Sequence, residues 1–104
     1  MIHVRKVAPE YFEALRSGRK RFELRDERDA EEPFAAGDFL ALNEWDDGMT
    51  QGGYIAGAVP HYTGRCLLFE ILYVLRNYEL LTPGAVCLSL SLRPLRPDDV
   101  AAIR

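Results

Sequence analysis

Several residue types and segments that define a class of protein are scarce in this sequence. It contains two cysteines in 104 residues, and neither Cys66 nor Cys87 has the spacing of a zinc site or of a disulfide framework. The longest apolar run, residues 66–75, includes Glu70 and is far shorter than the roughly 20 residues that cross a bilayer. We therefore expect two small buried thiols, no metal, no cofactor and no contact with a membrane.

The sequence also lacks an N-terminal signal peptide, because no apolar segment follows Met1. We expect a cytoplasmic protein. Internal repeats and low-complexity tracts are missing too, and 48% hydrophobic with 28% charged residues is an ordinary balance for a folded core. The 104 residues are therefore predicted to form a single domain, residues 1–104.

Positive charge is in the minority, since the formal net charge is −3. The charges are segregated, because residues 1–28 carry eight of the thirteen basic residues against five acids, whereas residues 29–104 carry five basic residues against eleven acids. The acidic total argues against general coating of nucleic acids. A site for anions is expected in the basic N-terminal part of the chain.

Alternation of apolar and polar residues, typical of β-strands, is abundant. Predicted strands cover residues 2–7, 19–26, 38–45, 63–76 and 85–92. Residues 9–18 predict a short amphipathic helix, with Pro9 at its first position and Gly18 just beyond its last turn. A helical turn is also expected within residues 97–103, and residues 46–64, with five of the eight glycines, are expected to form a long loop.

This order of elements predicts a mainly β protein of the α+β class. One helix follows the first strand, and four further strands come without the crossover helices that a doubly wound parallel sheet needs. In a chain of this length the pattern favours a small, mostly antiparallel β-barrel with one helix capping an end.

Glu70 and Lys20 are the charged residues predicted to point inward. Glu70 lies in a run that is apolar on both strand faces, and a buried carboxylate has to be paired, hydrogen-bonded or protonated. Lys20 shares one strand face with Phe22 and Leu24, while Arg21 lies on the opposite, exposed face. We therefore expect Lys20 and Glu70 to meet, either as a structural ion pair or as a functional pair in a cleft.

Two weaker groups of residues surround the glycine-rich segment. Trp45 and Tyr62 flank it together with Arg65, and aromatic side chains beside an arginine are typical of platforms on which RNA bases stack. The acids within residues 44–47 have the chemistry of a hard-cation site. A solvated edge is the favoured interpretation of these acids.

Five segments of the chain resemble a known family. They are PEYFEALRSGRKRFELRDERD, GDFLALNEWD, YTGR, EILYVL and VCLSL, at residues 9–29, 37–46, 62–65, 70–75 and 86–90. In content and order they resemble the ASCH superfamily of PUA-like domains, especially a small bacterial and phage branch of unassigned function. The most specific piece is the pattern G-x-K-x-x-E-x-R, which comprises Gly18, Lys20, Glu23 and Arg25.

The resemblance implies a PUA-like barrel of five to six strands with an RNA-binding cleft lined by Lys20, Glu23 and Arg25. One ASCH group is an amidohydrolase that deacetylates 4-acetylcytidine with a lysine, a threonine nucleophile and a glutamate. Lys20 matches its lysine and Glu70 its glutamate, whereas Glu23 stands at the threonine position. Other ASCH proteins are reported as ribonucleases.

Binding of RNA or of a nucleotide in the basic cleft is the first functional hypothesis. It predicts an affinity that falls steeply with salt. Lys20 and Arg25 would contact phosphate or a base edge from one side of the cleft. The ligand-binding residues expected beside Arg25 are Trp45, Tyr62 and Arg65.

Two other functions stay open at this stage. A hydrolase acting on a modified nucleoside or on RNA would use Lys20 and Glu70 as a charged pair and Glu23 to activate water. A protein-interaction domain would instead use the acidic C-terminal part of the chain. The oligomeric state does not follow from the sequence.

Overall fold

The computed structural model describes residues 1–50, 53–54 and 59–101. Its elements are β1 (Ile2–Val7), α1 (Pro9–Arg16), β2 (Phe22–Asp26), the 3-10 helix η1 (Glu27–Asp29), β3 (Phe39–Asp46), β4 (Met49–Thr50), β5 (Gly53–Tyr54), β6 (His61–Leu75), β7 (Ala85–Leu90) and α2 (Pro97–Ala101). The predicted strands and both helical segments are confirmed, with ends displaced by a few residues. The predicted loop 46–64 contains the short β4–β5 pair, and its residues 51–52 and 55–58 lie outside the described residues.

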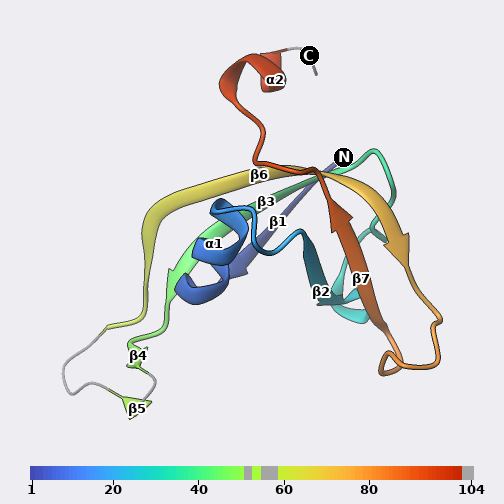
Figure 1. Cartoon of the computed structure of the whole chain (residues 1–104). Helices are drawn as coiled ribbons and strands as arrows, with labels where there is room; N and C mark the ends of the chain where they lie inside the picture. The colour runs from blue at the N-terminus through green and yellow to red at the C-terminus, as the bar shows by residue number, and fades with distance from the viewer. Residues whose placement is uncertain (51–52, 55–58, 102–104) are drawn as a thin grey trace.

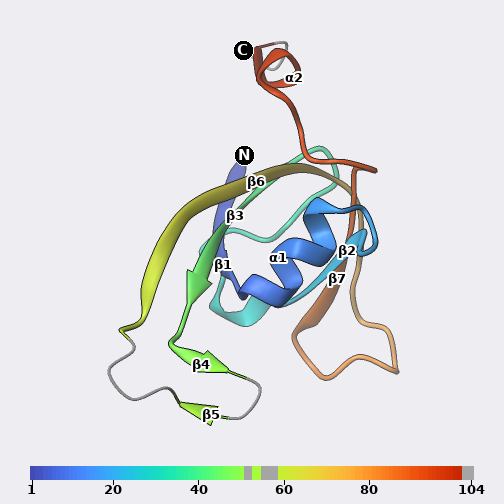
Figure 2. The ribbon, with the colours of Figure 1, turned by 60° about the vertical axis from the view of Figure 1, so that its left-hand side comes forward.

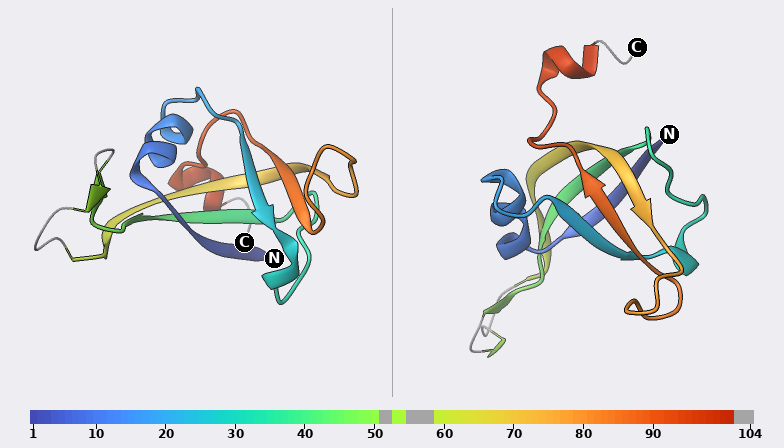
Figure 3. Two further views of the ribbon diagram at one scale, coloured as in Figure 1. Left: turned by 90° about the horizontal axis from the view of Figure 1, so that it is seen from below. Right: turned by 45° about the vertical axis from the view of Figure 1, so that its right-hand side comes forward.

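Five strands form one mixed sheet in the order β1-β3-β6-β7-β2. β1 and β3 are parallel, and the other neighbours are antiparallel. The 15-residue β6 pairs first with β3 and then, from Ile71, with β7, so it carries the bend around which the sheet curls (Figure 1). Among the described residues no ladder joins the two edge strands, β1 and β2, and the sheet is open along this seam (Figure 3).

Helix α1 lies within the curve of the sheet (Figure 2). Pro9 begins it, and Phe12 and Leu15 bury their side chains in the core. Gly18 takes a φ of 83°, a value that glycine adopts without strain, and the Lys20 N–H then donates to the Ala14 carbonyl at 2.9 Å. This turn delivers the chain from the end of α1 into β2.

The hydrophobic core is built from one helix, one loop residue and four of the five main strands. Its buried members are Val7, Phe12, Leu15, Phe34, Leu40, Leu42, Leu67, Phe69, Ile71, Val86, Leu88 and Leu90. β2 contributes no apolar residue to this cluster. None of the helices among the described residues is long and apolar enough to cross a membrane.

β2 presents its polar face to the interior, contrary to the prediction that Phe22 and Leu24 point inward. Phe22 is 45% and Leu24 55% exposed, whereas Glu23 is only 3% exposed. The pairing register explains the inversion, because Glu23 lies opposite the buried Leu88 of β7, and residues directly opposite in an antiparallel pair share a face of the sheet.

The prediction that β6 is buried on both faces is also wrong. Leu67, Phe69 and Ile71 are buried, but on the alternate face Glu70 is only half-buried and Leu72 is 48% exposed. Glu70 is therefore not a buried charge. Both cysteines are free thiols, as expected, but Cys66 is exposed and Cys87 half-buried.

Candidate functional site

A cleft with a volume of about 490 Å³ lies at the open seam of the sheet. It runs between the end of β1, the first turn of α1 and the edge strand β2. Its lining residues are Lys6, Val7, Ala8, Tyr11, Lys20, Phe22, Glu23, Leu24 and Arg25. The structure thus brings Lys20, Glu23 and Arg25 of the G-x-K-x-x-E-x-R pattern to one cavity beside the helix.

Three of the lining residues, Lys20, Glu23 and Arg25, form an ion triplet, here called the Glu23 cluster. One carboxylate oxygen of Glu23 accepts a hydrogen bond from Lys20 Nζ. The other accepts from Arg25 Nε at 2.8 Å and lies 2.7 Å from Arg25 Nη2. Because each side chain is at least three-quarters buried, the three groups hold one another in fixed positions.

Both cations of the Glu23 cluster make further contacts. Arg25 Nη2 donates to the Lys6 carbonyl at 2.8 Å, which ties β2 to β1 across the seam. Lys20 Nζ lies 4.9 Å from the ring centroid of Tyr11 and 5.2 Å from that of Phe22, both within cation–π range. The lysine ammonium therefore lies close to two aromatic rings that also line the cleft.

Lys6 links the cleft to the predicted aromatic platform. Its ammonium lies 4.1 Å from the ring centroid of Trp45 and 5.7 Å from that of Tyr62. The two aromatic rings meet edge to face, with centroids 4.7 Å apart. Trp45 and Tyr62 thus contact each other, and Lys6 connects them with the Glu23 cluster through its backbone carbonyl.

Arg65 stands apart from the cleft in a second ionic group, here called the Glu44 cluster: Glu13, Glu44, Thr63 and Arg65. Arg65 donates through Nε and Nη2 to Glu44 at 2.9 and 2.8 Å, and its Nη1 lies 2.9 Å from Glu13. Thr63 donates to Glu44 at 2.6 Å. The hydrogen bond from Arg65 is the main cause that lowers the pKa of Glu44, with the Thr63 bond assisting.

This arrangement changes the interpretation of two sequence-predicted residues. Glu44 is 3% exposed and paired, so it is part of neither a cation site nor a solvated edge. Arg65 also packs over the Phe12 ring at 4.4 Å, and its guanidinium is shared by two carboxylates. It lines a different cavity of about 260 Å³, together with Tyr62.

Glu70 does not join Lys20. Lys20 is paired with Glu23, whereas the Glu70 carboxylate makes no hydrogen bond or ion pair within the described part of the chain. Only its backbone N–H is engaged, donating to Ser91 Oγ at 3.2 Å. Glu70 is also not among the residues that line the cleft. The expected meeting of Lys20 and Glu70 is therefore wrong.

Six of the nine lining residues, among them Lys6, Tyr11 and Phe22, were not identified as site residues from the sequence. Tyr11 lies in the predicted amphipathic helix, and Phe22 was predicted on the inward face of its strand. A signal existed for Lys6, because it continues the face of Ile2 and Val4 in β1 as its one charged member. That face is exposed, with Ile2 59% and Val4 56% accessible.

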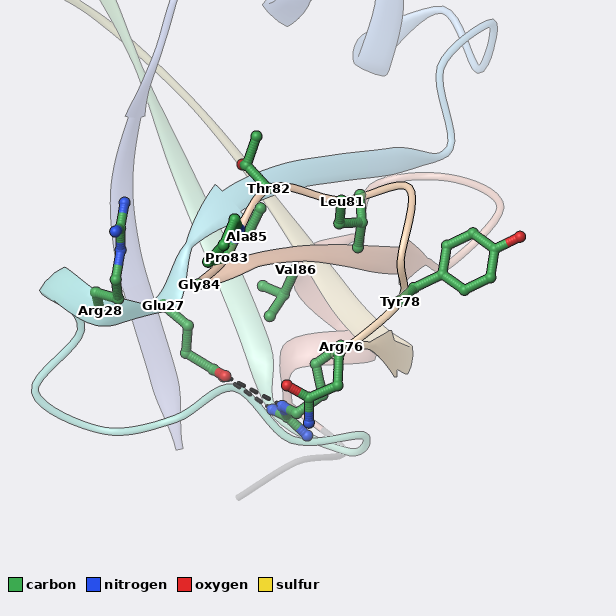
Figure 4. Close-up of a pocket in the computed structure, with 11 residues that line it drawn as sticks. Glu27, Arg28, Arg76, Tyr78, Leu81, Thr82, Pro83, Gly84, Ala85 and Val86 are labelled. Carbon is green, nitrogen blue, oxygen red and sulfur yellow. Dashed lines mark hydrogen bonds and ion pairs between the residues drawn. The ribbon is translucent and has the colours of Figure 1, made fainter.

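Another cavity, of about 250 Å³, lies at the turn between β6 and β7 (Figure 4). Two of its charged lining residues are paired with each other, since Arg76 donates to Glu27 at 3.0 and 2.8 Å. Arg76 also donates to the Phe34 carbonyl at 2.7 Å. Tyr78 points away from it (Figure 4). Within the described ranges no three histidine, cysteine or acidic side chains are grouped to hold a metal ion.

Comparison with known proteins places the chain in a family without assigning an activity. No match is found among curated proteins. The sequence model of one family, described as a domain of unknown function (DUF3850), matches residues 2–90, which include the cleft and both ionic clusters. The chain therefore belongs to the DUF3850 family.

Proposed function

We propose that this chain is a cytoplasmic domain that binds RNA or a nucleotide in the cleft beside α1. We also propose that its curled five-stranded sheet corresponds to the barrel of PUA-like domains, as the ASCH resemblance implies. The observation that carries the function is the composition of the cleft, which is lined by three cations, Lys6, Lys20 and Arg25, and by one buried carboxylate, Glu23. Such a site attracts anions by charge and by preorganised hydrogen-bond donors.

The aromatic residues near the cleft suit a nucleotide better than a simple anion. Tyr11 is 51% and Tyr62 54% exposed, and exposed rings beside cations are typical of surfaces on which bases stack. Trp45 lies against Lys6 at the border of the cleft. Phosphate on the cations and a base on a ring is the arrangement that these positions favour.

The hydrolase alternative finds less support than binding. A Lys/Glu pair exists, but its carboxylate is Glu23, and both oxygens of Glu23 already accept hydrogen bonds from Lys20 and Arg25. Three of the roughly four lone-pair sites of this carboxylate are thus engaged by cations, which leaves about one for the proton that a general base would remove. Glu70, the other proposed catalytic carboxylate, does not line the cleft.

Fluorescence of Trp45, the only tryptophan of the chain, provides a direct test. Titration with short single-stranded RNA and with mononucleotides should change its emission, and the affinity should decrease as salt is raised. Lys20→Gln should weaken binding about tenfold or more, because it removes a charged donor from the cleft. Arg21→Gln is the matched control, since Arg21 is exposed and its Nε donates to the Gly18 carbonyl.

Two results would contradict the proposal. One is an absence of binding by RNA and by every mononucleotide at low salt. The other is equal loss of affinity in the Lys20 and Arg21 variants, because binding would then follow the total charge of the chain and not the cleft.

A further inference from the structure

The residues that line the cleft carry a surplus of two positive charges, because Glu23 is their one acidic member. Lys20 and Arg25 are paired with Glu23, and the third cation, Lys6, adds its charge from the border of the cleft, where its ammonium lies over Trp45. A phosphodiester inside a polynucleotide bears one negative charge, whereas a terminal phosphate monoester bears about 1.5 to 2 near neutral pH and offers three strong acceptor oxygens. The charge balance of the cleft therefore matches a monoester.

The donors that remain after the Glu23 cluster has formed also fit three acceptor oxygens. Glu23 takes one N–H of Lys20 together with Nε and Nη2 of Arg25. Arg25 Nη1 takes part in no hydrogen bond among the described residues. Each of the two cations thus keeps N–H groups for a ligand, while Glu23 fixes the place from which they are offered.

One hydrogen bond joins β2 and β1 across the seam, since Arg25 Nη2 donates to the Lys6 carbonyl at 2.8 Å. This bond helps to hold the Arg25 guanidinium in place within the cleft. The cleft volume of about 490 Å³ is in the range of small-molecule sites.

From these observations we infer that the cleft recognises a terminal phosphate monoester, carried either by a mononucleotide or by the phosphorylated end of an RNA. The inference rests on the proposed function and narrows it. Lys20 and Arg25 contact the phosphate, Glu23 positions both of them, and Lys6 supplies the second surplus charge.

Calorimetric titration with three matched probes tests this inference: adenosine 5′-monophosphate, its methyl ester and adenosine. The methyl ester keeps the base, the sugar and the phosphorus but has one negative charge. We expect it to bind about tenfold more weakly than the monoester, because one charge-assisted contact is lost. A 5′-phosphorylated and an unphosphorylated RNA tetranucleotide, titrated in parallel, distinguish an RNA end from a free nucleotide.

The variant Lys6→Gln lowers the surplus to a single charge without disturbing the core, since the Lys6 side chain is exposed. Its preference for the monoester over the methyl ester should fall to about threefold or less. Arg21→Gln changes the net charge of the chain equally but lies outside the cleft, so it should keep the full preference.

The possible failures are distinguishable. Equal affinity of the wild-type chain for the monoester and the methyl ester would overturn the monoester inference and leave nucleotide binding intact. An unchanged preference in Lys6→Gln would overturn the charge argument behind the inference. Binding by none of the probes, RNA included, would overturn the proposed function and with it the inference.

Discussion

The Glu23 and Glu44 clusters are built alike but differ in their ratio of cations to carboxylates. Each contains a glutamate that is 3% exposed and that accepts hydrogen bonds through both carboxylate oxygens. In the Glu23 cluster two cations share one carboxylate, whereas in the Glu44 cluster one guanidinium, that of Arg65, is shared by two carboxylates. The first arrangement leaves a surplus of positive charge, and the second does not.

The surroundings of the two clusters agree with this difference. The Glu23 cluster lies on an edge strand and opens into the largest of the cavities described above. Arg65 joins β6 to β3 through Glu44 and to α1 through Glu13, which ties the helix to the centre of the sheet. We therefore regard the Glu44 cluster as a structural link and the Glu23 cluster as the binding site.

The largest effect on stability is expected from Glu23→Gln. The change leaves Lys20 and Arg25, both mostly buried, facing each other without a carboxylate, which should lower the free energy of unfolding by roughly 3 kcal/mol. Added phosphate should restore part of this loss, because an anion in the cleft takes the place of the missing charge. Denaturant unfolding with and without phosphate measures both effects.

Chloride at the same ionic strength is the control for this rescue, since it screens charge without a phosphate geometry. Equal stabilisation of the wild type, Glu23→Gln and Glu44→Gln by phosphate would contradict the distinction between a binding site and a structural link. The two clusters would then not differ in their ability to accept an anion.

A smaller loss, of about 1 to 2 kcal/mol, is expected from Glu44→Gln. The glutamine side chain can still accept from Thr63, and Arg65 keeps its pair with Glu13, so no cation is left without a partner. Thermal unfolding should show a decrease in melting temperature without any rescue by phosphate, and nucleotide affinity should stay within about twofold of the wild type.

Glu13 explains why Glu44→Gln is expected to cost less than Glu23→Gln, and a double-mutant cycle tests the explanation. Glu13→Gln alone should change the melting temperature little, because the Glu13 side chain is 42% exposed. In the Glu13→Gln background, however, loss of Glu44 leaves Arg65 unpaired and should be more costly than in the wild type. Additive effects of the two changes would contradict the shared role of Arg65.

The sequence predicted the elements better than it predicted these clusters. Alternation located most of the main strands, a continuous apolar run located β6, and Pro9 and Gly18 located α1. Alternation does not say which face of a strand turns inward. For β2 the apolar face, Phe22 and Leu24, was assigned to the core, but the pairing of Glu23 with Leu88 turned it outward.

The pairing of charged residues could not be predicted from the sequence for a similar reason. Lys20 and Glu23 are three residues apart and were assigned to opposite faces, yet the lysine precedes the regular strand and its side chain turns to Glu23. Glu44 and Arg65 are 21 residues apart in the chain and meet only because β3 pairs with β6. Such pairs depend on register, which a single sequence leaves open.

The smallest expected effect is a difference in acid stability. Arg65 and Thr63 lower the pKa of Glu44 in the folded chain, and the pKa of a glutamate in an unfolded chain is about 4.3. A group whose pKa is depressed by folding stabilises the fold above its unfolded pKa, and this contribution is lost as the pH falls through the folded value. The wild type should therefore lose stability below about pH 4.5.

Glu44→Gln should show a shallower loss over the same pH range, because the variant has no carboxyl group to protonate at this position. The stability of the variant should still depend on pH to some extent, since Arg76 lowers the pKa of Glu27 and His3 lowers that of Asp38. Unfolding midpoints measured from about pH 6 to pH 3 give the change of stability with pH for the wild type and for the variant. Identical slopes would mean that Arg65 gives the Glu44 carboxylate no net stabilisation, and the Glu44 cluster would then lose the structural role that distinguishes it from the Glu23 cluster.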